Sequence, residues 1–173
     1  MIIRSFMTAA ALVAASSAGA QAPACIPQRQ AEALFLAMAP AVIGTVAATC
    51  APALPPSAIL RRSVGPLTAK FAAESDAAWP LAREALRTLV GPEAGAMVDS
   101  ELARPMVTAM VAPLLAKEVK LKDCGSIDRV LRLIDPLPAR NTAGLVVAIM
   151  EMAGNDRKRV NAPLAICPLP NRP

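Results

Sequence analysis

One segment near the end of the chain, from Asn141 to Gly154, is apolar on every side of the helix that its residues favour. Glu151 is the only charged residue in it. Asn141 or Thr142 can cap its start, and Gly154 suits a helix C-terminus because it adopts the left-handed conformation without penalty. A helix that is apolar all round is a buried helix, and this one is too short to span a bilayer. We therefore expect it to be the central helix of an all-α domain.

The N-terminus has the three regions of a secretory signal peptide. Arg4 supplies a positive charge, residues 7–15 form a short apolar run, and Ala18-Gly19-Ala20 fits the small-residue rule for cleavage. The run is far shorter than the ~20 residues of a membrane-spanning helix. We therefore interpret residues 1–20 as a signal peptide that is cleaved before Gln21 and leaves no transmembrane anchor. Residues 21–173 then form a single all-α domain, with an extended tail over about 155–173.

The composition bears on the compartment and on the classes of partner. Abundant Ala and Pro, with Arg well ahead of Lys, suggest a GC-rich bacterial genome, so the exported protein is expected to be periplasmic or extracellular. Losing Arg4 lowers the formal net charge from +5 to +4. There is no dense basic tract, and Phe35, Phe71 and Trp79 are the only aromatic residues after the signal peptide. Nucleic acid is therefore not an expected partner.

Four cysteines remain after cleavage: Cys25, Cys50, Cys124 and Cys167. An even number of cysteines in an exported chain predicts two disulfides, because that compartment is oxidising. A zinc site is the competing interpretation, but the chain has no C-x-x-C pair and no histidine. The usual ligand spacings are therefore missing, and no metal or cofactor is expected.

The four cysteines allow three pairings. Cys124 and Cys167 flank two helical segments whose ends a helical hairpin would bring together, so Cys124–Cys167 is the predicted bond. Cys25–Cys50 follows by elimination and requires Pro40 to fold the first helix back on itself. A Cys50–Cys124 bond would instead imply a straight first helix, whose rise of ~1.5 Å per residue keeps Cys25 far from Cys50.

Proline divides the rest of the chain into helical segments. Gly65-Pro66 and Gly91-Pro92 place Gly where a helix ends and Pro where the next begins, and Trp79-Pro80 is a third expected break. No run alternates with period two, so no strand is expected. The sequence predicts a compact, disulfide-stabilised bundle of six to eight short helices, at about 28–50, 57–64, 66–78, 80–90, 92–103, 105–121, 126–135 and 141–154.

Few residues indicate chemistry. Without histidine there is no Ser-His-Asp or Cys-His nucleophile, and no glycine-rich phosphate loop is present. Glu151 is the acid of most interest, because burial in an apolar helix would raise its pKa and make it a proton donor. An exposed or ion-paired Glu151 is the commoner arrangement in proteins.

Methionines recur in the apolar segments. Met106, Met110 and Met150, together with Glu151, are the candidates for lining a cavity that holds a lipid or another apolar ligand. Thioether ligation of Cu(I) is a weaker alternative, because methionine is also a common filler of helical cores. Lys117, Lys120 and Lys122 gather at a helix end, where they fit the negative end of the helix dipole or an anionic lipid surface.

These observations favour an exported, non-enzymatic binding or interaction module of the cell envelope. Its expected partner is another envelope protein or a second copy of the chain. The alternative is a carrier of a lipid or other apolar ligand in a cavity between helices.

Overall fold

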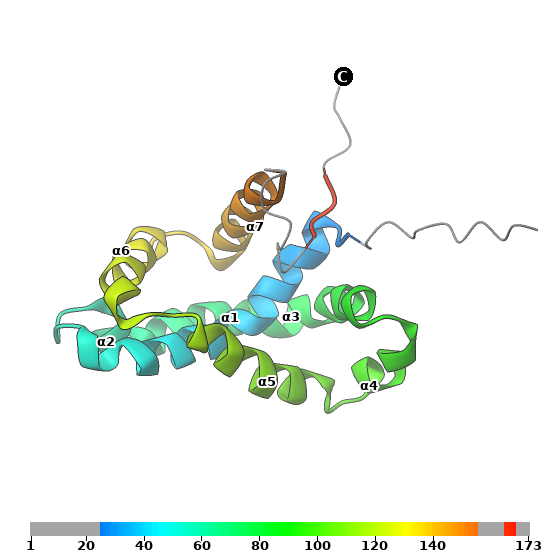
Figure 1. The fold of residues 1–173 in the computed structure, drawn as a ribbon, viewed down its shortest axis with the longest axis horizontal. Helices are drawn as coiled ribbons and strands as arrows, with labels where there is room; N and C mark the ends of the chain where they lie inside the picture. Colours follow the sequence, from blue (N-terminus) through cyan, green and yellow to red (C-terminus); the bar gives the residue numbers. More distant parts are fainter. Residues whose placement is uncertain (1–24, 156–164, 169–173) are drawn as a thin grey trace, which may run out of the picture.

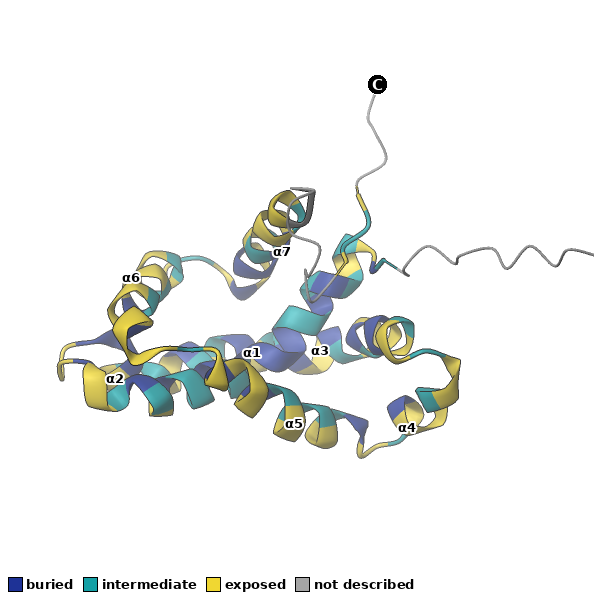
Figure 2. Ribbon diagram, in the orientation of Figure 1, coloured by how far each residue is buried: buried dark blue, intermediate teal, exposed yellow. Residues whose placement is uncertain are grey.

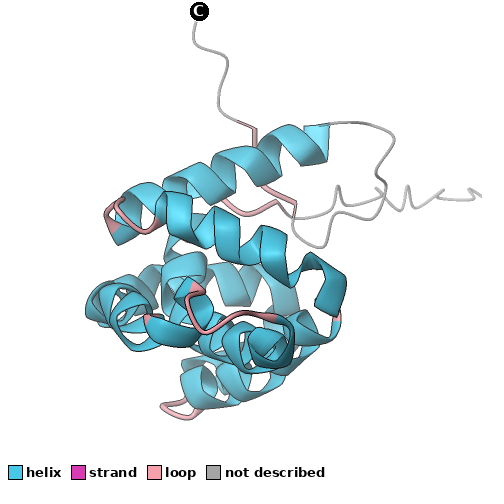
Figure 3. Ribbon diagram, turned by 90° about the vertical axis from the view of Figure 1, so that its left-hand side faces the viewer, coloured by secondary structure: helices cyan, strands magenta, loops and turns pink. Residues whose placement is uncertain are grey.

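A computed structural model describes residues 25–155 and 165–168 (Figure 1). Within these ranges the chain forms seven α-helices and no strand, so the predicted all-α class is confirmed (Figure 3). The predicted signal peptide, its cleavage site and most of the predicted tail lie outside the described residues. The helices are α1 (Gln28–Cys50), α2 (Ile59–Arg62), α3 (Val64–Val90), α4 (Gly95–Asp99), α5 (Ala103–Lys117), α6 (Cys124–Ile134) and α7 (Ala139–Asn155).

Helix α1 is the centre of the fold. It carries no charge from Ala33 to Cys50, and Ala48 is its only exposed residue after Arg29. Helices α3, α5 and α7 all pack against it. With the adjoining residues to Ala53, α1 is long and apolar enough to cross a membrane by length and composition alone. In this fold its buried side chains form the core.

The prediction that residues 141–154 form the central helix is wrong. Helix α7 lies at the edge of the molecule, and Figure 2 shows exposed residues along it. It buries a face that includes Ala139, Thr142, Ala143 and Val147, whereas Leu145 stays 44% exposed and Ile149 51% exposed. The helix that follows the rule is α1, because an all-apolar helix is expected to be buried. Its apolar residues include many alanines as well as large side chains.

The expected breaks at proline are only partly present. Gly91 ends α3 with a φ of 77°, and Pro92 starts the next turn of 3₁₀ helix, as predicted. Helix α3 nevertheless continues through Pro80, and α1 continues through Pro40. The predicted separation into 66–78 and 80–90 is therefore wrong. A proline removes one backbone hydrogen bond, and here the packing of the long α1–α3 contact outweighs that loss.

Small side chains dominate the packing between the helices. Phe71 is buried and meets Phe35 edge-on, with the ring centroids 6.0 Å apart, and half of the buried residues in the core around this pair are alanine. Small residues let helix axes approach closely, so few large side chains fit between them. The buried alanines include Ala33, Ala37, Ala39 and Ala47 of α1, Ala78 and Ala82 of α3, Ala112 and Ala116 of α5, and Ala143 of α7.

The predicted pairing of the cysteines is wrong, although all four form disulfides. Cys25 pairs with Cys167 and Cys50 with Cys124, at Cα–Cα distances of 4.9 and 5.5 Å. Because α1 runs unbroken for 23 residues, it is about 34 Å long and holds Cys25 far from Cys50. Each end of α1 is therefore bonded to a different later part of the chain.

The Cys25–Cys167 bond is accompanied by backbone pairing. Ile26 N–H donates to the Ala165 carbonyl at 2.8 Å, and Cys167 N–H donates to the Ile26 carbonyl at 2.9 Å. These two bonds form a single parallel β-bridge beside the disulfide. The described part of the C-terminal segment is thus fixed to the start of α1, with the Ile26 side chain fully buried.

Burial of the sulfur atoms predicts the order in which the two bonds are reduced. Cys50 and Cys124 are both 0% exposed, whereas Cys25 and Cys167 are partly exposed. A mild thiol reductant in native buffer should therefore open Cys25–Cys167 first, as followed by alkylation and peptide mass mapping.

Replacing both Cys50 and Cys124 by Ala should lower the free energy of unfolding by about 4–5 kcal/mol, because the bond closes a loop with a sequence separation of 74. A mapped Cys124–Cys167 peptide would contradict the pairing.

Candidate functional site

The most distinctive surface of the described chain is an uncharged face of α5. Leu102, Met106, Met110 and Leu114 follow one another at spacings of four and are 65%, 43%, 65% and 57% exposed. Residues four apart share one side of a helix. A second row, Pro105, Ala109 and Pro113, is also exposed. We call these seven residues the α5 apolar face.

Specific polar contacts hold α5 so that this face points outward. The Arg104 guanidinium donates to the buried Ser75 hydroxyl of α3 and pairs with Asp76. It also lies 5.7 Å from the centre of the Trp79 ring. On the inner side, Ala112 and Ala116 are buried. The α5 apolar face is therefore the side of α5 that does not pack against the rest of the chain. The contacts of Arg104 with α3 fix the orientation of this face.

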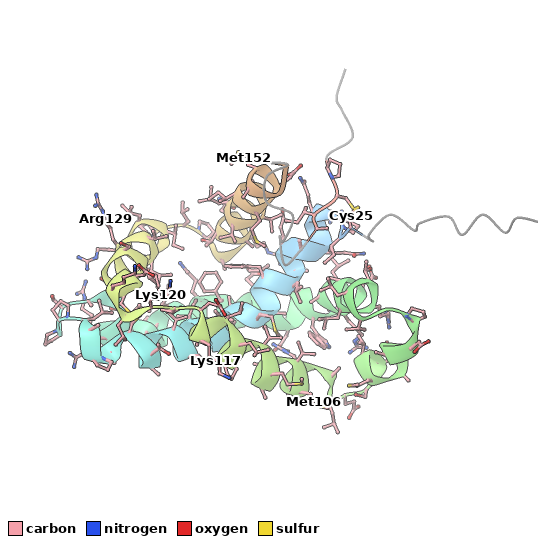
Figure 4. All side chains as sticks on the ribbon, in the orientation of Figure 1. Cys25, Met106, Lys117, Lys120, Arg129 and Met152 are labelled. Atoms are coloured by element: carbon pink, nitrogen blue, oxygen red, sulfur yellow. A yellow bond between two sulfur atoms is a disulfide. The ribbon has the colours of Figure 1, made fainter. Side chains whose placement is uncertain are left out.

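Opposite charges lie at the two ends of the α5 apolar face. Glu93, Asp99 and Glu101 are exposed before its start. Lys117, Lys120 and Lys122 are exposed at and after its end, where Glu118 and Asp123 are also exposed and leave these five residues with a net charge of +1. Asp99 pairs with Arg87, but the three lysines form no ion pair with any described carboxylate. Figure 4 shows Lys117 and Lys120 at the end of α5 that is remote from Met106. The face is thus uncharged along its length and polarised at its ends.

The structure does not bring the predicted cavity residues together. Met106 and Met110 lie on the exposed face of α5, while Met150 and Glu151 belong to α7. Figure 4 shows Met106 at one edge of the molecule and Met152 of α7 at the opposite edge. The Glu151 carboxylate accepts a hydrogen bond from the Gln28 side chain, which joins α7 to the start of α1. The four residues therefore do not line one interior space.

A pocket that is partly open to solvent lies elsewhere, between α1, α3 and α7. Its volume is about 160 Å³. It is polar on one side, and Arg140 there is held by Glu74 at 2.6 Å. A space of this size and lining suits a small polar molecule or water better than a lipid chain. Its lining residues are Arg29, Glu32, Ala33, Leu36, Ala77, Ala78, Leu81 and Arg140.

A buried carboxylate joins α6 to α2. Asp128 is 4% exposed, accepts a hydrogen bond from the Leu60 backbone N–H at 3.0 Å, and pairs with Arg132 at 2.6 Å. It takes the capping role at the start of α2, where no side chain of the local sequence does so. Helix α6 itself begins at Cys124, two residues before its predicted start at 126.

The environment of Asp128 favours its ionised form. Burial acts to raise the pKa of this carboxyl, but the backbone N–H groups of Leu60 and Ile59 and the guanidinium of Arg132 outweigh it. The pKa therefore lies below its ordinary value of 3.8. Asp128 has a structural role, because its contacts are with Leu60 and Arg132 of the same chain.

All four cysteines are in disulfides, so none is available as a thiolate ligand. Within the described ranges no group of three or more Cys, Asp or Glu residues is placed to hold a metal ion. Comparison with models of known protein families, with characterised proteins and with solved structures finds no match to this chain. Any function must therefore be argued from the surface itself.

Two features escaped the sequence analysis for different reasons. Asp128 lies 68 residues from its partner Leu60, and no local pattern reveals such a contact. The α5 apolar face did carry a signal, because its two rows of residues repeat every four positions. Such a pattern predicts a buried face rather than an exposed one, because an apolar helix face usually packs against the core.

We expect the Asp128→Asn variant to unfold more easily than the wild type at pH 7, by about 1–3 kcal/mol, because a charged acceptor is lost from a buried site. The pKa of Asp128 is lower in the folded chain than in the unfolded chain. Its stabilising effect is therefore present above about pH 4 and is lost as the pH falls through the folded-state pKa. The difference in the urea unfolding free energy between the two proteins should thus narrow as the pH is lowered below about 4.

The matched control for this prediction is Asp135→Asn. Asp135 is exposed and lies 3.8 Å from Lys70, so this variant should lose less than ~1 kcal/mol. Equal losses in the two variants, or a difference between Asp128→Asn and wild type that does not narrow as the pH falls below about 4, would refute the role given to Asp128.

Proposed function

We propose that the protein is an exported, non-enzymatic binding module of the cell envelope, and that it binds through the α5 apolar face. The observation that carries the proposal is the exposure of Leu102, Met106, Met110 and Leu114 on a helix fixed from behind by Arg104. Contiguous exposed apolar surface that is rimmed by charge is typical of interaction sites. The rim here is formed by Glu101 at one end and Lys117 at the other.

Export is supported by two features. Both disulfides are formed, and four paired cysteines with no free thiol are characteristic of chains that fold in an oxidising compartment. The N-terminal residues 1–20 have the order of charge, apolar run and small residues expected of a signal peptide. We therefore assign the protein to the periplasm or the exterior of a bacterial cell.

Binding at a surface is favoured over carriage of a lipid in an interior cavity. The methionines that would line such a cavity are exposed and lie on separate helices. The described cavity of about 160 Å³ is smaller than the ~300–1,000 Å³ of typical ligand pockets, and it is lined partly by charged residues.

Site-specific cross-linking tests the proposed surface. The full chain is expressed for export in a bacterial host with a light-activated cross-linking amino acid in place of Met110. We expect a covalent adduct of higher mass, because Met110 lies in the middle of the α5 apolar face and is 65% exposed.

The matched control places the same amino acid at Leu133 of α6, which is 70% exposed and apolar but outside the α5 apolar face. It should give little adduct. A second variant carries the cross-linking amino acid in place of Leu114, on the same face. Equal adducts at positions 110 and 133 would overturn the proposal, and so would the absence of an adduct at both 110 and 114.

A further inference from the structure

We infer that the α5 apolar face binds the same face of a second copy of this chain, so that two α5 helices pair antiparallel across a twofold axis. The inference rests on the proposed function, because it names the occupant of the surface on which that function depends. Three properties of the face point to a second copy: its order of residues, its shape and the charges at its ends.

The order of the large residues is self-complementary. Leu102, Met106, Met110 and Leu114 read the same in both directions along the helix. In a twofold interface, a contact between residue i of one copy and residue j of the other is repeated in reverse, between residue j of the first copy and residue i of the second. In an antiparallel pair centred between Met106 and Met110, Leu102 lies opposite Leu114 of the second copy and Met106 lies opposite its Met110. Both contacts are apolar and of matched size.

The shape of the face is also complementary to itself. The large residues form a ridge at spacings of four, and the smaller residues Pro105, Ala109 and Pro113 form a lower row beside it. When ridges of this spacing pack against the rows of residues three apart on a second helix, the two axes cross at only about 20°, so the ends of the two helices stay side by side. The row of smaller residues forms a groove that can receive the ridge of the second copy. The groove of the second copy can receive the ridge of the first in the same way.

The end charges select an antiparallel arrangement. Glu101 precedes the ridge, Lys117 follows it, and both are exposed without a described ion-pair partner. Antiparallel pairing sets the acidic end of one copy beside the basic end of the other, at both ends of the interface. It also opposes the two helix dipoles favourably. A parallel pair would place Lys117, Lys120 and Lys122 against the same three lysines.

An anionic membrane surface fits the face less well than a second copy does. The lysines at one end would be attracted to it, but Glu93, Asp99 and Glu101 at the other end would be repelled. Helices that lie on membranes usually carry basic residues along the whole polar side. Between Arg104 and Lys117 there is no charged residue at all.

The extent of the face sets the strength of the dimer. Helix α5 has 15 residues and is about 22 Å long, so a single helix pair buries less than the ~800 Å² per partner of a standard interface. We therefore expect a reversible dimer with a dissociation constant in the micromolar range, detected by sedimentation equilibrium of the purified, oxidised protein.

Substitution of the ridge tests where the dimer forms. Met110→Glu and Leu114→Glu should each weaken association by more than tenfold, because each places two symmetry-related charges in the apolar contact. Leu133→Glu on α6 is the control and should leave the dimer unchanged. Circular dichroism and thermal unfolding of each variant confirm that the fold is retained, as expected for side chains that are more than half exposed.

A charge exchange tests the orientation. Glu101→Lys and Lys117→Glu should each weaken the dimer by about 2- to 30-fold, since each affects two exposed ion pairs. The double variant carrying both changes should recover the wild-type dissociation constant, because opposite charges again face each other. A double variant weaker than either single variant contradicts the antiparallel arrangement.

Other outcomes reject the dimer, and they differ in whether they also reject the proposed function. A monomer at all concentrations up to ~1 mM rejects the dimer. If that monomer binds vesicles of phosphatidylglycerol and Met110→Glu abolishes this, the face serves a membrane instead. If the adduct at position 110 contains a different protein, the proposed function holds and the second copy does not. A dimer unaffected by Met110→Glu and Leu114→Glu refutes the assignment to α5.

Discussion

The fold depends on covering one helix. From Ala33 to Cys50, α1 presents no charge in any direction, so other helices must cover much of its surface, and Ala48 is the one exposed residue of this stretch. Helices α3, α5 and α7 do this together, and α3 makes the most extensive contact. The hydroxyls that α1 does carry are satisfied within the helix, as Thr45 bonds the Ala41 carbonyl at 2.8 Å.

The covalent bonds act on the same helix. Because Cys25 and Cys50 lie at the two ends of α1, their partners Cys167 and Cys124 fix distant parts of the chain to those ends. At the second end Asp128, four residues after Cys124, bonds the backbone at the start of α2. The disulfide and the buried carboxylate therefore place α6 by independent interactions, one covalent and one electrostatic. At the first end, the β-bridge at Ile26 adds backbone bonds to the disulfide.

The sequence supports the class of the fold better than its arrangement. Helical periodicity, the absence of period-two alternation and four cysteines after a predicted signal peptide predict an all-α, disulfide-bonded fold correctly. Local signals also place Gly91 at a helix end. The same signals misplace α7 at the centre, because the apolar character of a segment does not reveal whether alanines or larger residues face the core. The pairing of cysteines depends on whether Pro40 breaks α1, and that is decided by tertiary contacts.

The alanine-rich core and the apolar surface have one cause. Helices α5 and α7 bury small residues, among them Ala112, Ala116 and Ala143, and such residues allow helices to pack closely. On α5 the large residues therefore occupy the outer side, where Arg104 fixes them by holding the inner side to Ser75 and Trp79. On α7 the same division buries Ala143 and Val147 and exposes Ile149. An apolar surface held in this way is already helical, so the proposed partner would not have to order the helix on binding. That saving in conformational entropy makes even a short helical face effective for association.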